Sequence, residues 1–61
     1  MNDTRPTALI AEDEPLMRER LKERLAETWP ELEIVAEAAD GDEALALFDV
    51  HEPRVAFLDI R

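Results

Sequence analysis

The sequence has 61 residues, no cysteine, and a formal net charge of -9 from 16 acidic and 7 basic side chains. A chain of this length forms at most one small domain, which buries only about 60% of the surface that its unfolded chain exposes. Without cysteine it has no disulfide or thiolate–metal site to add stability. The acidic balance argues against direct binding of nucleic acid, which needs a basic surface, and suits divalent cations or a basic partner.

The first half of the chain predicts a strand followed by a helix. Residues 7–11, TALIA, form an unbroken apolar run, which is typical of a strand covered on both faces in a parallel sheet. A helix is expected from Pro15, which suits a first helical turn, to about Trp29, with Asp13 or Glu14 as its cap. The apolar face of this helix contains Met17, Leu21 and Leu25.

The second half predicts a strand, a helix and another strand. Residues 32–38, LEIVAEA, alternate partly between apolar and polar, as in an edge strand. Asp40 and Glu43 have the spacing of a capping box and predict a helix that runs to about Val50. The buried face of this helix is expected to contain Ala44, Leu47 and Phe48. Residues 55–59, VAFLD, form a third, apolar strand.

Alternation of strands and helices indicates an α/β protein whose parallel strands are joined by right-handed crossovers. We expect half of a flavodoxin-like doubly wound parallel sheet, with the three strands in the order 2-1-3. Residues 1–61 contain no internal linker or repeat and are expected to form the N-terminal part of one domain. No apolar run approaches the roughly 18 residues of a membrane-spanning helix, and MNDTRPT lacks the layout of a secretory signal. These features favour a cytoplasmic location without membrane contact.

Carboxylates follow two of the predicted strands at the points where those strands end. Glu12 and Asp13 end the first strand and Asp59 ends the third. In the order 2-1-3 these strands are neighbours, and ligands of such sheets bind outside the carboxyl ends of the strands. Convergent carboxylates repel one another and raise each other's pKa, which a bound Mg²⁺ relieves while leaving room for phosphate oxygens. In the simpler alternative, these acids only cap the first helix and a later turn, but no single cap explains both strand ends.

The segments LIAEDEP, EIVAEAADGDEALALF and VAFLDIR together resemble the receiver domain of two-component response regulators, from about Thr7 to Arg61. The resemblance implies that Asp59 is the phosphoacceptor and takes a phosphoryl group from a sensor histidine kinase. It also implies that Glu12 and Asp13 are the acidic pair, with Asp13 a direct ligand of Mg²⁺. Asp59 itself and the backbone carbonyl of Arg61, two residues after the acceptor, would be the further ligands.

The resemblance also carries expectations about output. The receiver itself would not be an enzyme, and it would control a downstream function such as transcription. The pattern EDEPLMRERLKERL…WPELEIVAEA is similar to receivers coupled to LytTR-type DNA-binding domains, so DNA would be contacted only through a downstream domain. The family often has Asp in place of Glu12, and the longer side chain favours contact with the metal through water. A full receiver has further strands that carry a Ser/Thr and a Lys for the phosphoryl oxygens.

Other functions fit part of the pattern. In one, the apolar edge of the strand at 55–59 pairs with a second copy or a complementing fragment, without phosphotransfer. In another, the chain is a phosphohydrolase of the haloacid dehalogenase type, but that family needs a second Asp where this sequence has Arg61. His51, the only histidine, is expected in the last turn of the second helix, far from the acids. The arginines of the first helix are expected to be a solvated face: Arg18, Arg20 and Arg24.

Overall fold

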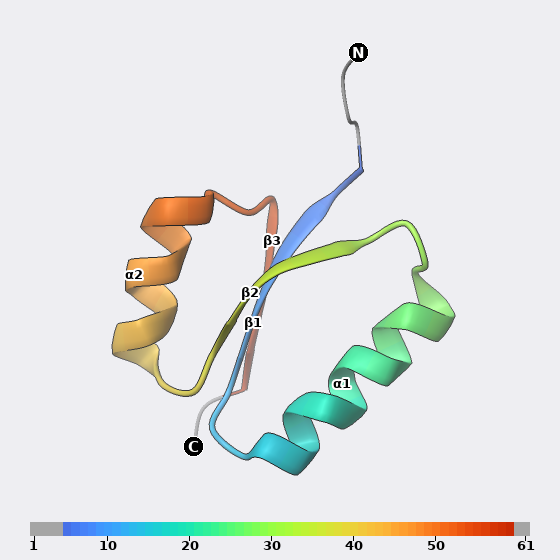
Figure 1. The fold of residues 1–61 in the computed structure, drawn as a ribbon, viewed down its shortest axis with the longest axis horizontal. Helices are drawn as coiled ribbons and strands as arrows, with labels where there is room; N and C mark the ends of the chain where they lie inside the picture. The colour runs from blue at the N-terminus through green and yellow to red at the C-terminus, as the bar shows by residue number, and fades with distance from the viewer. Residues whose placement is uncertain (1–4, 60–61) are drawn as a thin grey trace.

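The computed structural model describes residues 5–59 of the chain. Its elements are β1 (Thr7–Glu12), α1 (Pro15–Thr28), β2 (Glu33–Ala38), α2 (Gly41–His51) and β3 (Val55–Asp59). The strands are parallel and lie in the order β2-β1-β3, with α1 and α2 on opposite faces of the sheet (Figure 1). The predicted α/β class, the parallel pairing and the 2-1-3 order of a partial flavodoxin-like sheet are confirmed.

The central strand β1 holds the core together. Its residues from Ala8 to Glu12 are all buried, because strands lie on both sides of it and a helix covers each face. The alternate side chains of a strand point to opposite faces, so Leu9 and Ala11 face α2 while Ile10 faces α1. The cluster on the α2 face is built mainly from small side chains: Leu9, Ala11, Ala36, Ala38 and Ala44.

The start of α1 differs from the prediction. Glu14 is the N-cap residue, but its side chain makes no capping hydrogen bond, and neither Asp13 nor Glu14 acts as the expected side-chain cap. Instead, Glu12 Oε2 accepts a hydrogen bond of 3.0 Å from the backbone N–H of Glu14. The carboxylate that ends β1 therefore stabilises the turn into α1, and Pro15 follows where no N–H donor is needed.

α1 lies on the sheet less deeply than its apolar pattern predicts. None of its residues is fully buried, and Met17 is 36% exposed. Charged side chains link it to the edge strand β2, since Glu37 pairs with Lys22 at 3.0 Å and with Arg18 at 3.8 Å. The helix is thus attached on its β2 side, while residues of its other side line a hollow that also reaches Asp59, the last residue of β3.

The capping box of α2 is confirmed, with one change of partner. Asp40 Oδ1 accepts from the N–H of Glu43 at 2.8 Å, and Glu43 Oε1 accepts from the N–H of Ala39 at 2.6 Å. The helix ends at His51, one residue beyond the predicted end, and is closed by Glu52 in the left-handed conformation, with φ of 47°.

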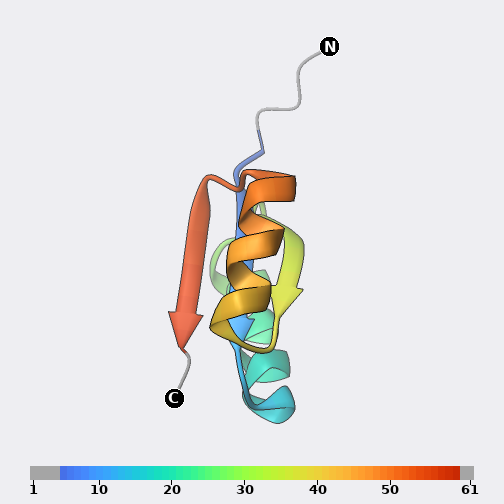
Figure 2. The same cartoon turned by 90° about the vertical axis from the view of Figure 1, so that its left-hand side faces the viewer.

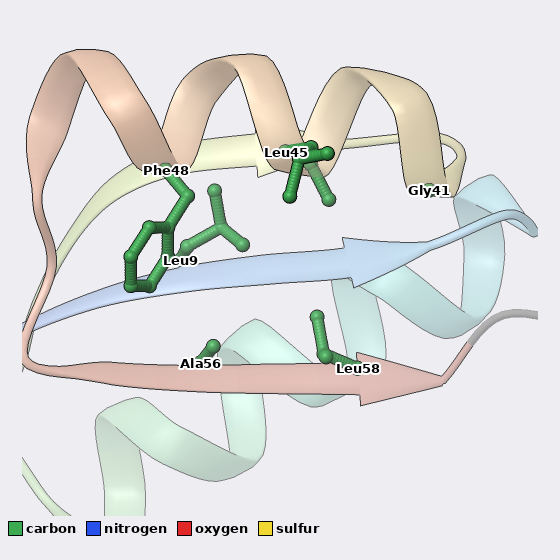
Figure 3. A pocket seen from close by; sticks show the side chains of 7 residues that line it. Leu9, Gly41, Leu45, Phe48, Ala56 and Leu58 are labelled. Carbon is green, nitrogen blue, oxygen red and sulfur yellow. The ribbon is translucent and has the colours of Figure 1, made fainter.

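The prediction that Phe48 is buried is wrong. Its side chain is 43% exposed, because within residues 5–59 no element covers the space between α2 and β3. Leu45 and Phe48 from α2, Leu9 from β1, and Ala56 and Leu58 from β3 line an open apolar groove of about 220 Å³ there (Figure 3). Of the predicted apolar face of α2, only Ala44 is fully buried.

In the part of the chain from residue 5 to residue 59, neither helix combines the length and the apolar character that crossing a membrane requires.

Candidate functional site

Two of the predicted site residues lie side by side at the carboxyl edge of the sheet. Glu12 is the last residue of β1 and Asp59 the last of β3, and their Cα atoms are register partners in the parallel pair. Figure 2 shows that the strands end at the same edge. Asp13 follows Glu12 directly, at the turn into α1. The register of the sheet therefore brings together the carboxylates that the sequence placed at separate strand ends.

The three carboxylates differ in their access to solvent. Glu12 is only 2% exposed, whereas Asp13 and Asp59 are exposed. The Glu12 carboxylate is held by the N–H of Glu14, while the carbonyl oxygen of Glu12 accepts a 3.0 Å hydrogen bond from Arg18 Nη1. Glu12 is thus fixed in place by α1, and the two aspartates remain accessible to a ligand or a reacting group.

The electrostatics of Glu12 reflect this crowding. The hydrogen bond from the Glu14 N–H favours the charged form and acts to lower the pKa of Glu12. Burial opposes this effect, and so do the neighbouring carboxyl groups of Asp13 and Asp59, with the net result that the pKa of Glu12 is raised. A cation at this edge would relieve the repulsion and favour the charged carboxylates.

The donor chemistry of the site fits Mg²⁺. Mg²⁺ prefers oxygen ligands, keeps several of its waters, and commonly uses one or two carboxylates together with phosphate oxygens. Within residues 5–59 no three or more His, Asp or Glu side chains form a group that could by itself hold a metal ion. A site with fewer protein ligands, completed by water, is the arrangement that these carboxylates suit. Arg61, the fourth predicted ligand, lies outside the described residues, so its role stays a prediction.

A hollow of about 290 Å³ adjoins these carboxylates on the α1 side of the sheet. Its walls are formed by Glu12, Met17, Arg20, Leu21, Arg24 and Asp59. We expected all the arginines of α1 to form a solvated face, and the position of Arg20 and Arg24 beside the acids was not predicted. The i, i+4 spacing of Arg20 and Arg24 is the signal that places both on one side of the helix.

His51 takes no part in this arrangement. It lies in the last turn of α2, which leads to the start of β3, whereas the acids lie where β1 and β3 end. The expected position of His51, far from the acids and near the negative end of the helix dipole, is confirmed.

Comparison with known proteins supplies close relatives. An uncharacterised response regulatory protein of Vibrio cholerae is 56% identical over 61 residues, which are 100% of this chain and 23% of that protein. The transcriptional regulatory protein PdtaR of Mycobacterium tuberculosis is 47% identical over 53 residues, 87% of this chain and 25% of PdtaR. A protein-glutamate methylesterase/protein-glutamine glutaminase of Carboxydothermus hydrogenoformans is 47% identical over 51 residues, 84% of this chain and 15% of that protein. No family model and no solved structure matches the chain.

The fold and the edge of carboxylates define an α/β protein of the partial flavodoxin-like class. The relatives then make the identification specific: the chain is homologous to response regulatory proteins and shares with them the receiver segment. It spans about a quarter or less of the length of the relatives named here. Their names include a transcriptional regulator and a methylesterase, so the shared segment does not by itself specify an output.

Proposed function

We propose that this chain is a signalling receiver that accepts a phosphoryl group on Asp59 from a phosphohistidine of a sensor histidine kinase. The observation that supports this most strongly is the register pairing of Asp59 with the buried Glu12, next to Asp13, in a chain homologous to response regulators. Glu12, Asp13 and Asp59, with the backbone carbonyl of Arg61, are the proposed ligands of Mg²⁺. When bound, the ion would neutralise charge on the transferring phosphoryl oxygens.

The exposed carboxylate of Asp59 would act as the nucleophile. One of its oxygens attacks the phosphorus of the phosphohistidine, a P–O bond forms and the P–N bond breaks. The electron pair of the broken bond returns to the imidazole, which takes up a proton. Asp59 then carries an acyl phosphate, and the kinase histidine is regenerated in its neutral form.

Glu12 and Asp13 would have different tasks. The burial of Glu12 and its hydrogen bond from Glu14 hold its carboxylate at one position, so Glu12 would place a fixed negative charge beside Asp59. Asp13 is exposed and would contact the ion directly, while the longer Glu12 would contact it through water. The phosphorylated receiver would then control transcription through a DNA-binding domain, since one relative is named as a transcriptional regulatory protein.

Phosphorylation of the chain tests this proposal. The chain is incubated with Mg²⁺ and acetyl phosphate, and its intact mass is measured before and after treatment with base, which cleaves acyl phosphates. We expect one base-labile phosphoryl group on the chain, and none on Asp59→Asn or in the presence of a chelator. Asp49→Asn, which removes an exposed aspartate of α2, is the matched control and should be modified like the parent. An unmodified parent chain would refute the proposal.

An assembly role is the second candidate, and the edge of β3 favours it. Among the described residues β3 pairs with β1 alone, so its outer edge offers unpaired backbone groups beside the apolar groove. Leu58 on this strand is 67% exposed. We propose that a second copy of the chain pairs along this edge, since an exposed apolar edge strand invites pairing with another chain.

Sedimentation equilibrium tests the assembly. The parent chain should form dimers more readily at high ionic strength, because salt screens the repulsion between two chains of charge -9. Leu58→Lys should weaken the dimer, since charges on an edge strand oppose pairing, whereas Leu16→Lys on α1, also at an exposed leucine, should not. A folded monomer at every salt concentration would rule the dimer out.

A further inference from the structure

The hollow beside the site combines charges of both signs. Glu12 and Asp59 line it where it meets the carboxyl edge of the sheet. Its other walls come from α1: Met17, Arg20, Leu21 and Arg24. Although the net charge of the whole chain is -9, two arginines border the acidic edge here. A negatively charged group that forms at Asp59 would find guanidinium groups on one side of it.

The cations of α1 fall into two sets. Arg18 and Lys22 are engaged, because both pair with Glu37, Arg18 also donates to the carbonyl of Glu12, and Lys22 also pairs with Glu19. Lys22 and Arg18 are half-buried, and these contacts direct them toward β2.

Arg20 and Arg24 form the second set. Both are exposed and line the hollow on the β3 side, and no hydrogen bond or ion pair within residues 5–59 occupies either guanidinium. Arg20 and Arg24 can therefore take a new anionic partner without giving up an existing one.

We propose that Arg20 binds the phosphoryl oxygens of phosphorylated Asp59. The inference rests on the proposed phosphotransfer to Asp59 and names a residue that would bind the phosphorylated aspartate. Conversion of the carboxylate to an acyl phosphate adds about one negative charge and new acceptor oxygens. A guanidinium group suits such oxygens, because its planar set of N–H donors forms paired hydrogen bonds with phosphate.

The position of Arg20 along α1 distinguishes it from Arg24. The helix starts at the carboxyl edge of the sheet, and Arg20 lies five residues after Pro15, about 7.5 Å along the axis. Arg24 lies one turn further on, about 6 Å more distant from the edge that carries Asp59. An extended arginine side chain reaches back toward the start of its helix, so Arg20 is the residue placed to reach the phosphoryl group.

The contact would stabilise the acyl phosphate relative to the free carboxylate. Loss of the phosphoryl group by hydrolysis proceeds when water attacks phosphorus, the P–O bond to Asp59 breaks, and inorganic phosphate and a proton are released. A contact present in both the acyl phosphate and its transition states speeds formation and leaves hydrolysis nearly unchanged. The measurable result is a larger phosphorylated fraction at a given concentration of phosphodonor.

The test compares matched variants of the chain with acetyl phosphate and Mg²⁺. Arg20→Gln should lower the ratio of phosphorylated to unphosphorylated chain by about twofold to fivefold, the range for a solvent-exposed charge pair. Arg20→Lys should restore part of it. Arg54→Gln, at the opposite end of β3, changes the net charge equally and should leave the ratio unchanged. Arg24→Gln should lower the ratio less than Arg20→Gln does, because Arg24 lies one helical turn further from Asp59. Equal losses in Arg20→Gln and Arg54→Gln would show a general charge effect and overturn the inference.

A direct readout on the parent chain supports the comparison. The Nε–Hε signal of Arg20 in ¹H–¹⁵N NMR spectra should shift and exchange more slowly with water after phosphorylation, while that of Arg54 stays in place. A phosphorylated parent chain without this change would overturn the role of Arg20 and leave phosphotransfer intact. A parent chain that takes no phosphate would instead refute the proposed function on which the inference rests.

Discussion

Leu9 lies at the centre of the core, and its replacement by alanine tests how the small domain is held together. Its side chain is 1% exposed and contacts a cluster made otherwise of alanines. Leu→Ala in a core costs about 2 to 5 kcal/mol. Leu9 borders the open groove, which lets the site relax or admit solvent, so we expect a loss near the lower end, about 3 kcal/mol.

The control is Leu45→Ala, the same substitution in the same groove at a side chain that is 70% exposed. Only about a third of its surface is buried, so its loss should be about 0.5 kcal/mol. A chain of 61 residues has a free energy of unfolding of about 3 to 9 kcal/mol. Leu9→Ala therefore removes a third or more of the total.

Urea unfolding followed by far-ultraviolet circular dichroism measures both variants. We expect a much lower midpoint for Leu9→Ala and a nearly parental one for Leu45→Ala. Equal midpoints for the two variants would refute the assignment of Leu9 to the core and of Leu45 to an open groove.

Three further changes have defined outcomes. Asp40→Ala removes the acceptor for the Glu43 N–H and should lower the free energy of unfolding by about 1 kcal/mol in urea titrations; an unchanged value would contradict the capping role. Glu52→Gly relieves a non-glycine residue in the left-handed conformation and should raise the thermal midpoint, with a gain of roughly 0.5 to 1 kcal/mol. In metal-free buffer the free energy of unfolding should rise as the pH falls through the folded-state pKa of Glu12, because that pKa is raised and the folded chain binds the proton more tightly. Glu12→Gln should lack this rise and, on the proposed Mg²⁺ site, should gain less stability from added Mg²⁺ than the parent.

Much of the fold could be predicted because local and global signals agree. The apolar run at 7–11 predicts the buried central strand, and the spacing of Asp40 and Glu43 predicts the start of α2. Convergence of Glu12 and Asp59 followed from the strand order alone, since parallel neighbours end at one edge.

The errors have a common physical cause. Periodicity marks which side chains can be buried, but burial depends on a neighbouring element, and Phe48 has none over it within residues 5–59. The cap of α1 was missed for a similar reason, because the acceptor is Glu12, which belongs to the preceding strand. The hollow between Arg20 and Asp59 depends on how α1 lies against the sheet, which the sequence does not state.

The hydrogen bond from the backbone N–H of Glu14 to Glu12 links the acidic edge of the sheet to the start of α1. A carboxylate oxygen has more than one lone pair, so Glu12 Oε2 can keep the Glu14 N–H while the carboxylate contacts a cation through water, and the cation would polarise this hydrogen bond. The amide that precedes α1 would therefore respond to a change of charge at the acidic edge. Amide exchange at this single N–H would follow occupancy of the acidic edge without any added label.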